Sequence, residues 1–528
     1  MVFLLFFSHT NRLEMVPGCI EVANIAVWWR GKKVRSANPP LRVNRVIEGQ
    51  DPIKVTREIF LKDMDEFAKK QKIKHNRSQS PSAGSHPSSF RDQQEKENTR
   101  IACGRPRDVE ETIPSTLLHP AFGQFIDDCK NNRITEEDNA FIHELANVNS
   151  ALYENEDKRI AAVSKVLAAY RLGFRLHSRV QGTAYQTDAD MSIDVRGNCH
   201  SFVIAEFKNE AATSSSEPYV QALNYYLEST RNFAPQMSGS ALPCFILILF
   251  GPYVVFASAV WTLRPAAQLL SNPLAFNYHS TDTDNQMAAA RHMAAFRKAV
   301  RSLERHYETL PPDSALANTL CHPMLFPYPT SFTSLDDNSE ISFKYTEHLK
   351  NNGGQSTKLI FFGTLAEGDA EAAICIKFVR RYSRDAHLHC ARSGVAPRLR
   401  GFEQLPGGWY MIVMDKLVGY DVLADLPDSE RIPRRVFEAI GEHLKTLHAC
   451  QLVHGDLRDT NIMVMKDDRT KFMIIDFDWA GVEEVVRYPP YVNYAHIKRP
   501  HDARDGEVVK AAHDYFMLDV LIDMRADK

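Results

Sequence analysis

Three polar side chains in the C-terminal third have the types and spacing that phosphoryl transfer requires. The segment His454-Gly-Asp456-Leu-Arg-Asp-Thr-Asn461 is followed, twenty residues after Asp456, by Asp476 at the end of an apolar run. The reaction needs a carboxylate near the attacking hydroxyl and oxygen ligands that hold Mg²⁺ on the phosphates. In this pattern Asp456 would accept or orient the hydroxyl proton, Asn461 would bind Mg²⁺, and Asp476 would bridge the metal to phosphate oxygens.

The elements around this segment would position the three side chains. The apolar runs LVHGDL, NIMVM and KFMIIDF predict short strands on both sides of a loop. Further upstream, SEISFKYTEHL, TKLIFFGTL and AAICIKFV predict three more strands, and the last of these carries Lys377. Helical segments follow to the end of the chain.

This arrangement resembles the catalytic core of the eukaryotic protein kinase-like superfamily. The resemblance implies that Lys377, in Ala-Ile-Cys-Ile-Lys-Phe, holds the α- and β-phosphates of ATP, and that Arg458 lies near the transferring phosphate. It implies that Asp514 ties down the catalytic loop from a helix. It also implies that the residues after WYMIV form the hinge that grips adenine, with Met414, Asp415 and Leu417 as the binding residues.

The sequence departs from the superfamily pattern in three places. The glycine-rich loop is absent, and Gly353 and Gly354 between the first two strands are the best substitute. No helix glutamate is available to pair with Lys377, since the segment after that strand offers only Asp385 or His387. No Ala-Pro-Glu follows Asp476, so the platform on which protein kinases bind peptides is reduced.

HGDLRDTN and its flanking segments resemble the atypical kinase-like domains of basidiomycete fungi that are grouped with Crinkler-type proteins. The flanking segments are ARSGVAPRLRGFEQLPGGWYMIVMDKL and DFDWAGVEEVVRYPPYVNYAHIKRPHDARDGEVVKAAHD. The resemblance covers roughly residues 335–528. Because aminoglycoside and choline phosphotransferases share the His-Gly-Asp form, a small-molecule acceptor stays an alternative to a protein.

A second set of charged residues lies upstream, in the run from Ser192 to Glu210. Side chains alternate between the two faces of a strand, so Glu206 and Lys208 point to the same side. Asp194, at the end of the preceding strand, would meet Glu206 and hold a divalent ion, while Lys208 positions or activates water. This is a layout for metal-assisted hydrolysis of phosphodiesters.

The upstream set resembles the PD-(D/E)xK nuclease superfamily over about residues 115–300. Gln221 and Tyr225, four residues apart on the following predicted helix, reproduce a pattern found in one branch and share a helix face. Two positions stay open. The carboxylate from the first helices is Glu144, Glu154 or Glu156, and Asp188 and Asp190 compete with Asp194. Crinkler-type proteins combine such nuclease-like and kinase-like modules in this order.

Composition narrows the class of protein. The chain has 528 residues, 44% of them hydrophobic, and a formal charge of -3, which gives no global basic field for nucleic acid or membrane. Its nine cysteines are scattered and never form C-x-x-C, so we expect reduced thiols, an intracellular protein, and no secretion. Gly251-Pro252 divides the charge-free stretch between Arg231 and Arg264, which predicts two buried strands rather than a membrane span.

Residues 69–110 are rich in Ser, Pro, Gln and Asn, which predicts a solvated linker whose basic start is a weak signal for the nucleus over the cytoplasm. We therefore predict a multidomain chain of α/β and α+β class, with three parts. A partly disordered N-terminal segment (1–110) precedes a restriction-endonuclease-like α/β domain (111–310) and a two-lobed protein kinase-like domain (311–528).

The predicted function is phosphotransfer that depends on ATP and Mg²⁺, to Ser or Thr hydroxyls of a protein. The alternatives are a small-molecule phosphotransferase and an inactive ATP-binding scaffold that regulates a metal-dependent DNA nuclease. Protein, small molecule and DNA are thus the expected partners, with no membrane. The sequence does not indicate an oligomeric state.

Overall fold

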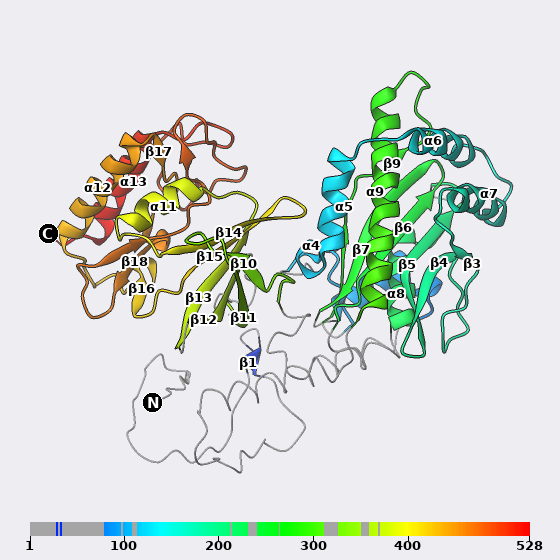
Figure 1. The fold of residues 1–528 in the computed structure, drawn as a ribbon, viewed down its shortest axis with the longest axis horizontal. Coiled ribbons are helices and arrows are strands. Elements are labelled where there is room, and N and C mark those ends of the chain that lie inside the picture. Colours follow the sequence, from blue (N-terminus) through cyan, green and yellow to red (C-terminus); the bar gives the residue numbers. More distant parts are fainter. Residues whose placement is uncertain are drawn as a thin grey trace, which may run out of the picture.

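The computed structural model describes residues 28–29, 32–33, 79–96, 99–107, 113–211, 214–230, 240–262, 264–310, 326–349, 358–367 and 370–527. Most of them form two bodies, which we call the N-terminal body (79–310) and the C-terminal body (326–527) (Figure 1). Two short strands, β1 (Trp28–Trp29) and β2 (Lys32–Lys33), pair with each other outside these bodies. None of the helices in the described part of the chain is long and apolar enough to cross a bilayer.

The N-terminal body is built on a mixed sheet with the strand order β3-β4-β5-β6-β7-β8, and β9 pairs with β7. β4 and β5 form an antiparallel hairpin, β5 and β6 are parallel, and β6 and β7 are antiparallel. The elements are α4 (Ser115–Leu118), α5 (Pro120–Asn131), α6 (Glu136–Asn149), α7 (Glu156–Ala169), β3 (Arg175–Leu176), β4 (Ala189–Val195), β5 (Asn198–Lys208), α8 (Pro218–Thr230), β6 (Cys244–Phe250), β7 (Tyr253–Trp261), β8 (Pro265–Leu269), β9 (Leu274–Ala275) and α9 (Thr283–Glu308).

Helices cover both faces of this sheet. Phe245 of β6 packs against Phe122 of α5 and Phe296 of α9, which places these two helices on one face. Trp261 of β7 points to the other face, where its indole donates a hydrogen bond to Thr230 at the end of α8. The charge-free stretch therefore forms two buried strands joined at Gly251-Pro252, as its pattern predicted.

The prediction of a solvated linker is wrong for residues 79–96 and 99–107. Helices α2 (Pro81–Gly84) and α3 (Pro87–Glu95) pack on the N-terminal body, and Ala102 pairs with Ala266 of β8. The polar side chains on which that prediction was based find hydrogen-bond partners within the protein. The buried Gln94 amide donates to the carbonyls of Ile101 and Arg105 and accepts from the backbone N–H of Ile101. The basic start of the segment lies outside the described residues.

The C-terminal body has two lobes. The first is a six-stranded antiparallel sheet with the order β10-β11-β12-β13-β15-β14, and the second is mostly helical, with small sheets β16-β18-β19 and β17-β20. The elements are β10 (Ser331–Thr333), β11 (Glu340–His348), β12 (Leu359–Glu367), β13 (Ala370–Val379), α11 (Arg384–Arg392), β14 (Leu399–Leu405), β15 (Trp409–Asp415), β16 (Tyr420–Val422), η2 (Leu423–Asp425), α12 (Arg434–Ala449), β17 (Leu452–Val453), η3 (Asp459–Asn461), β18 (Ile462–Met465), β19 (Phe472–Ile474), β20 (Gly481–Val482) and α13 (Ala511–Arg525).

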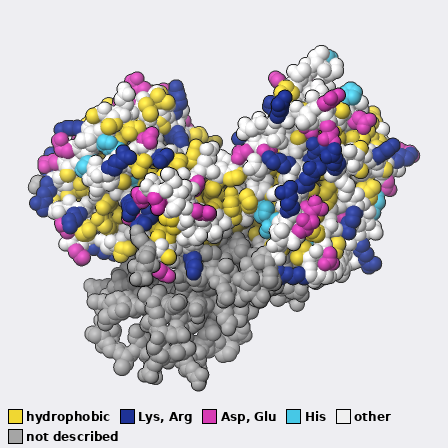
Figure 2. Space-filling model, in the orientation of Figure 1, with side chains coloured by type: hydrophobic (Ala, Val, Ile, Leu, Met, Phe, Trp, Pro, Cys, Tyr) yellow, Lys and Arg dark blue, Asp and Glu magenta, His cyan; other side chains and the backbone are white. Residues whose placement is uncertain are grey.

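The two bodies meet where the turn between β14 and β15 lies against α4 and α5. The Gly407 amide donates to Asp127 at 2.7 Å, and the Trp409 indole donates to the Thr116 hydroxyl at 3.0 Å. A Cβ on Gly123 would lie 2.6 Å from the carbonyl oxygen of Pro406, so only glycine permits this approach. One cluster of buried apolar side chains runs from the N-terminal body into the six-stranded sheet, and Figure 2 shows apolar side chains where the bodies meet.

Candidate active site

The loop that carries Asp456 is held in place by Asp514 of α13. The Asp514 carboxylate accepts hydrogen bonds from the backbone amides of His454 and Gly455, both at 2.8 Å, and from the His448 ring at 3.0 Å. These bonds confirm the prediction that Asp514 ties down the loop. Gly455 has φ +78°, and a Cβ there would lie 2.8 Å from the Trp479 carbonyl oxygen, which explains the glycine between His454 and Asp456.

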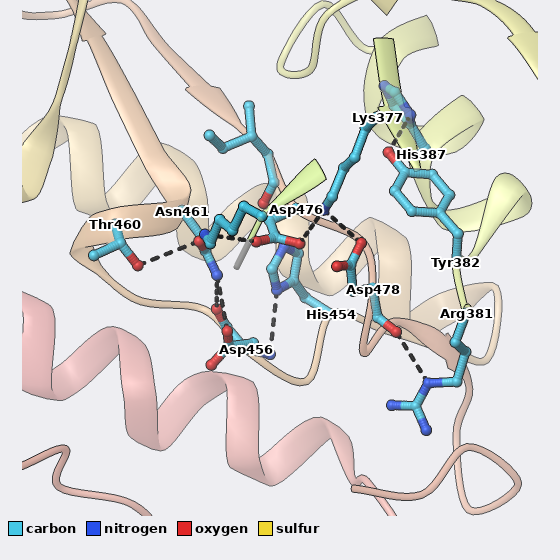
Figure 3. Close-up of polar contacts among 12 residues, drawn as sticks. Lys377, Arg381, Tyr382, His387, His454, Asp456, Thr460, Asn461, Asp476 and Asp478 are labelled. Atoms are coloured by element: carbon cyan, nitrogen blue, oxygen red, sulfur yellow. Dashed lines mark hydrogen bonds and ion pairs between the residues drawn. The ribbon is translucent and has the colours of Figure 1, made fainter. Parts of the chain in front are cut away.

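Asn461 links the loop to both neighbouring carboxylate segments. Its side-chain amide donates to the Asp456 carbonyl at 2.8 Å and to Asp456 Oδ2 at 3.0 Å (Figure 3). Its backbone carbonyl accepts from the amide of Ile475, which directly precedes Asp476. The two segments predicted to carry the chemistry are therefore joined by backbone and side-chain hydrogen bonds.

Lys377 of β13 reaches across to the segment after β19. Its amino group lies 2.6 Å from Oδ1 of Asp476 and 2.5 Å from Oδ1 of Asp478 (Figure 3). Lys358, just before β12, adds a second cation 3.6 Å from Oδ2 of Asp476. Asp476 has φ +70°, in the left-handed region that non-glycine residues seldom adopt. The structure thus brings together Lys377 and Asp476, ninety-nine residues apart in the sequence.

The partner of Lys377 is Asp478, and neither Asp385 nor His387 of α11 takes that place. Asp385 is exposed, and His387 is buried with its ring stacked on Phe477 at 4.7 Å. Sequence reasoning missed Asp478, although Asp-Phe-Asp stands where the superfamily has Asp-Phe-Gly and was the available signal. A carboxylate two residues after Asp476 thus replaces the missing helix glutamate.

Burial and Lys377 set the charges of this pair. Burial disfavours ionisation of Asp476, but Lys377 and Lys358 outweigh it and hold the pKa of Asp476 well below its usual value. Burial raises the pKa of Asp478 to about 7. Repulsion from Asp476 also raises this pKa, against the attraction of Lys377, which lowers it. The two carboxylates share one close lysine, and the pKa of Asp476 is lowered while that of Asp478 is raised.

The oxygens of Asp476 and Asn461 are the hard ligands that Mg²⁺ prefers. Carboxylate and amide oxygens from these two segments fit the donor set expected for the metal. Within the described residues, no group of three or more His, Cys, Asp or Glu side chains forms a metal site by itself. That Asn461 and Asp476 hold the ion together with phosphate oxygens stays a prediction.

The other residues predicted to bind the nucleotide lie in two places, the segment before β12 and the end of β15. Gly353 and Gly354 lie outside the described residues. Met414 and Asp415 end β15, where the Asp415 amide bonds Arg398 and its carboxylate binds Arg400. The amide of the intervening Lys416 bonds the Ala373 carbonyl at 3.1 Å. Contacts of Met414, Asp415 and Leu417 with adenine stay a prediction.

Arg458 lies beside the Asp456 carboxylate, with Nε 3.1 Å from Oδ2. A second guanidinium, that of Arg499, lies on the other oxygen, with Nη2 2.6 Å from Oδ1. No motif singled out Arg499, which lies forty-three residues after Asp456.

The upstream set assembles around Lys208 at the end of β5. The amino group lies 2.6 Å from Glu206, 3.7 Å from Glu156 of α7 and 4.0 Å from Asp188. Asp188 also accepts a hydrogen bond from the Phe207 amide at 2.9 Å. Of the three helix carboxylates left open by the sequence, Glu156 is therefore the one at Lys208, while Glu144 and Glu154 are exposed.

The assignment of Asp194 to this cluster is wrong. Asp194 is exposed at the turn end of the β4–β5 hairpin, where it accepts the Gly197 amide at 2.9 Å. It pairs with Cys199, seven residues before Glu206, which puts it roughly 20 Å away along the strand. Asp188 takes its place, and Asp190 is bound to Arg175 instead.

Burial governs the charges of the Lys208 cluster. It raises the pKa of Glu206, which is fully enclosed and whose Oε2 receives no hydrogen bond, and the nearby Asp188 charge adds to this. Burial also raises the pKa of Glu156 and of Asp188. A cavity of about 800 Å³ opens beside Lys208, with Arg105, Arg107 and Tyr219 in its wall.

Comparison with known proteins assigns a class to the C-terminal body. Residues 404–489 match the lipopolysaccharide kinase (Kdo/WaaP) family. No curated protein matches the chain. This matched range contains the loop of Asp456 and both carboxylates that bind Lys377.

Among solved structures, the chain is similar to the kinase PK-1 of Cydia pomonella granulovirus, with 14% identity and a TM-score of 0.28. The similarity covers 34% of this chain and 66% of that one, just under two thirds of its length. Vaccinia related kinase 3 gives 15% identity and a TM-score of 0.27, over 38% of this chain and 69% of that one. The family match at residues 404–489 supports a kinase-like phosphotransferase domain in the C-terminal body.

Proposed function

We propose that the C-terminal body transfers the γ-phosphoryl group of ATP to a Ser or Thr hydroxyl of a protein. The observation that carries the proposal is the ion pair of Lys377 with Asp476, next to the hydrogen-bonded pair of Asp456 and Asn461. These four residues come from three separate segments, and each has a side chain of the type that the reaction needs at that point.

Each residue has a role in the proposed reaction. Lys377 would hold the phosphates, and Asn461 and Asp476 would hold Mg²⁺, which neutralises phosphate charge when bound. The hydroxyl oxygen forms a bond to the γ-phosphorus as the bond to the β–γ bridging oxygen breaks and ADP leaves. Asp456 orients the hydroxyl and receives its proton.

Asp478 weakens the case for an inactive ATP-binding scaffold. That alternative rested on the missing helix glutamate, and Asp478 supplies Lys377 with a carboxylate at 2.5 Å. A small-molecule acceptor stays the second alternative for the same site, because both acceptor classes offer a hydroxyl.

The test uses the full-length protein, labelled ATP, Mg²⁺ and a generic protein acceptor. We expect label on Ser or Thr of the acceptor, no label with Asp456→Asn, and unchanged labelling with the control Asp519→Asn, an exposed carboxylate on α13. ATP binding should persist in Asp456→Asn. Undiminished transfer by that variant would reject the assignment, and label on a small hydroxyl compound but not on protein would favour the alternative acceptor.

A second candidate function, metal-dependent hydrolysis of DNA, is favoured by the Lys208 cluster. Its support is the convergence of Glu156, Asp188 and Glu206 on one lysine, beside a cavity whose wall carries Arg105 and Arg107. The Glu206 oxygen without a hydrogen-bond donor fits a cation. We expect Mg²⁺-dependent nicking of plasmid DNA that Lys208→Ala abolishes, with the exposed Lys158→Ala as control.

A further inference from the structure

Both oxygens of the Asp456 carboxylate are occupied by cations and donors of the chain itself. Arg499 holds Oδ1 at 2.6 Å, while Arg458 at 3.1 Å and the Asn461 amide at 3.0 Å hold Oδ2. Each carboxylate oxygen can accept more than one hydrogen bond, so an acceptor hydroxyl that approaches Oδ1 of Asp456 lies beside the Arg499 guanidinium. Arg458 and Asn461 belong to the catalytic loop itself, so Arg499 is the partner that comes from another part of the fold.

Arg499 lies on a segment that we call the strap, residues 487–508. The strap is closed at its base by the pairing of Arg487 with Val508. Inside it, the Asp505 carboxylate accepts the backbone amides of Tyr491 and Val492 at 2.7 and 3.0 Å. These bonds define the path of the strap, which carries Arg499 to Asp456 from the side of the helical lobe.

The Arg499 guanidinium is enclosed. Its side chain is 3% exposed, it lies 4.9 Å from the centre of the Trp479 ring, and its Nε has no hydrogen-bond partner. Among the described residues, Asp456 is the one carboxylate within ion-pair distance of it. Breaking a buried ion pair by removal of one partner typically costs about 3–5 kcal/mol, because the other charge is left uncompensated.

We propose that Arg499 makes the site selective for acceptors that carry an anionic group beside the reacting hydroxyl, an inference that rests on the proposed function. When Asp456 receives the proton of the hydroxyl, its carboxyl group becomes neutral and Arg499 loses its counter-charge. An anionic group on the acceptor compensates the guanidinium, whereas a neutral acceptor leaves it unpaired. For a protein acceptor, the group is the side chain of an Asp or Glu next to the phosphorylated Ser or Thr.

The experiment compares two peptides with the full-length protein: one with Ser flanked by Glu, and one with the same Ser flanked by Gln. We expect kcat/KM to be at least tenfold higher for the Glu peptide. In Arg499→Met this ratio should fall close to one, whatever the absolute rates, because the KM for the Glu peptide rises relative to that for the Gln peptide. Arg499→Lys, which keeps the charge, should retain a preference.

Lys498→Met is the matched control. Lys498 is the neighbouring cation on the strap, but it is exposed and its amino group lies 5.9 Å from the centre of the Phe516 ring, away from Asp456. This variant loses the same charge and should keep the full preference. A preference that disappears equally in Lys498→Met would mean that the charge of the strap as a whole acts, and would overturn the assignment to Arg499.

A measurement on the unmodified protein does not depend on the folding of any variant. Peptides with Ala in place of Ser should inhibit transfer, and the version flanked by Glu should inhibit at least tenfold more strongly than the version flanked by Gln. Equal inhibition, or equal transfer to the two Ser peptides, overturns the inference and leaves the proposed function standing. Absence of transfer to both peptides and to the generic protein acceptor contradicts the proposed function itself.

Discussion

The amino group of Lys377 lies 2.5 Å from Oδ1 of Asp478, a residue of the same segment that carries Asp476. The lysine on the sheet and both of its carboxylates are therefore held by two elements, β13 and the segment after β19. Helix α11 contributes no carboxylate to this pair. The ion pair does not depend on the position of a separate helix.

Asp478→Ala should impair nucleotide binding, because Lys377 loses one of its two carboxylates. We expect KM for ATP to rise several-fold and kcat to fall about tenfold, which corresponds to roughly 1.4 kcal/mol of transition-state stabilisation. Steady-state kinetics with varied ATP would measure both. Asp385→Ala on α11 is the control, and a larger loss there than in Asp478→Ala would show that the helix supplies the partner after all.

Asp514→Ala should destabilise the catalytic loop. Two backbone amides and the His448 ring would lose their buried acceptor, and an unsatisfied buried donor costs about 1–3 kcal/mol. We expect a lower free energy of unfolding in urea and loss of phosphotransfer. Wild-type stability together with wild-type transfer would contradict this role of Asp514.

The pH dependence of stability should contain a contribution from His387. Burial, with a smaller effect of Lys377, lowers the pKa of His387 to about 4, while its backbone bond to Pro397 acts in the opposite direction. The unfolded chain has a pKa near 6.5, so between these values the unfolded state binds the proton and the folded state does not. The contribution is complete above pH 6.5 and is lost as the pH falls to 4.

His387→Gln tests this dependence, because Gln can accept from Tyr382 and donate to the Pro397 carbonyl without titrating. The wild type should lose up to roughly 3 kcal/mol between pH 6.5 and 4 through this group. The difference in unfolding free energy between wild type and variant should therefore shrink over that range. A difference that is constant with pH would contradict the buried neutral state of His387.

Gly123→Ala should weaken the contact between the two bodies. The added methyl group would lie 2.6 Å from the Pro406 carbonyl oxygen, and overpacking of this kind costs about 1–3 kcal/mol. Calorimetry should give a lower midpoint of thermal unfolding, or two transitions in place of one. Gly173→Ala is the control, since a Cβ there meets no atom within 4 Å. Equal effects of the two substitutions would exclude a specific role of the contact.

The site of the C-terminal body could be predicted to a large extent because its residues lie in short, ordered motifs. Asp456 and Asn461 share one loop, and Asp476 follows an apolar strand, so local spacing was sufficient. Arg499 could not be predicted in the same way. It reaches Asp456 through the path of the strap, and no periodicity or local motif encodes that path.

The error at Asp194 has a different physical origin. A strand hairpin brings together residues at equal distances from its turn, so the position of the turn decides which carboxylate faces Glu206. The turn lies at Arg196-Gly197, both with positive φ, so Asp194 lies beside the turn and pairs with Cys199. One irregularity between Met191 and Ser192 shifts the register by one residue further along, which brings Asp188 rather than Thr187 level with Glu206. The hairpin was predictable, but the distance of each carboxylate from its turn was not taken into account.

Because of the close contact at Gly123, the folding of the C-terminal body depends on the N-terminal body. The ribosome completes α4 and α5 before β14 and β15 are made, so the later strands meet an apolar surface that is already present. If the second body were produced without the first, Trp409 would lose Thr116 and its apolar cover, and this surface would promote aggregation. Neither body can therefore be fused to an unrelated domain without loss of this contact. A replacement domain would need an apolar surface that fits the one around Trp409 or Thr116.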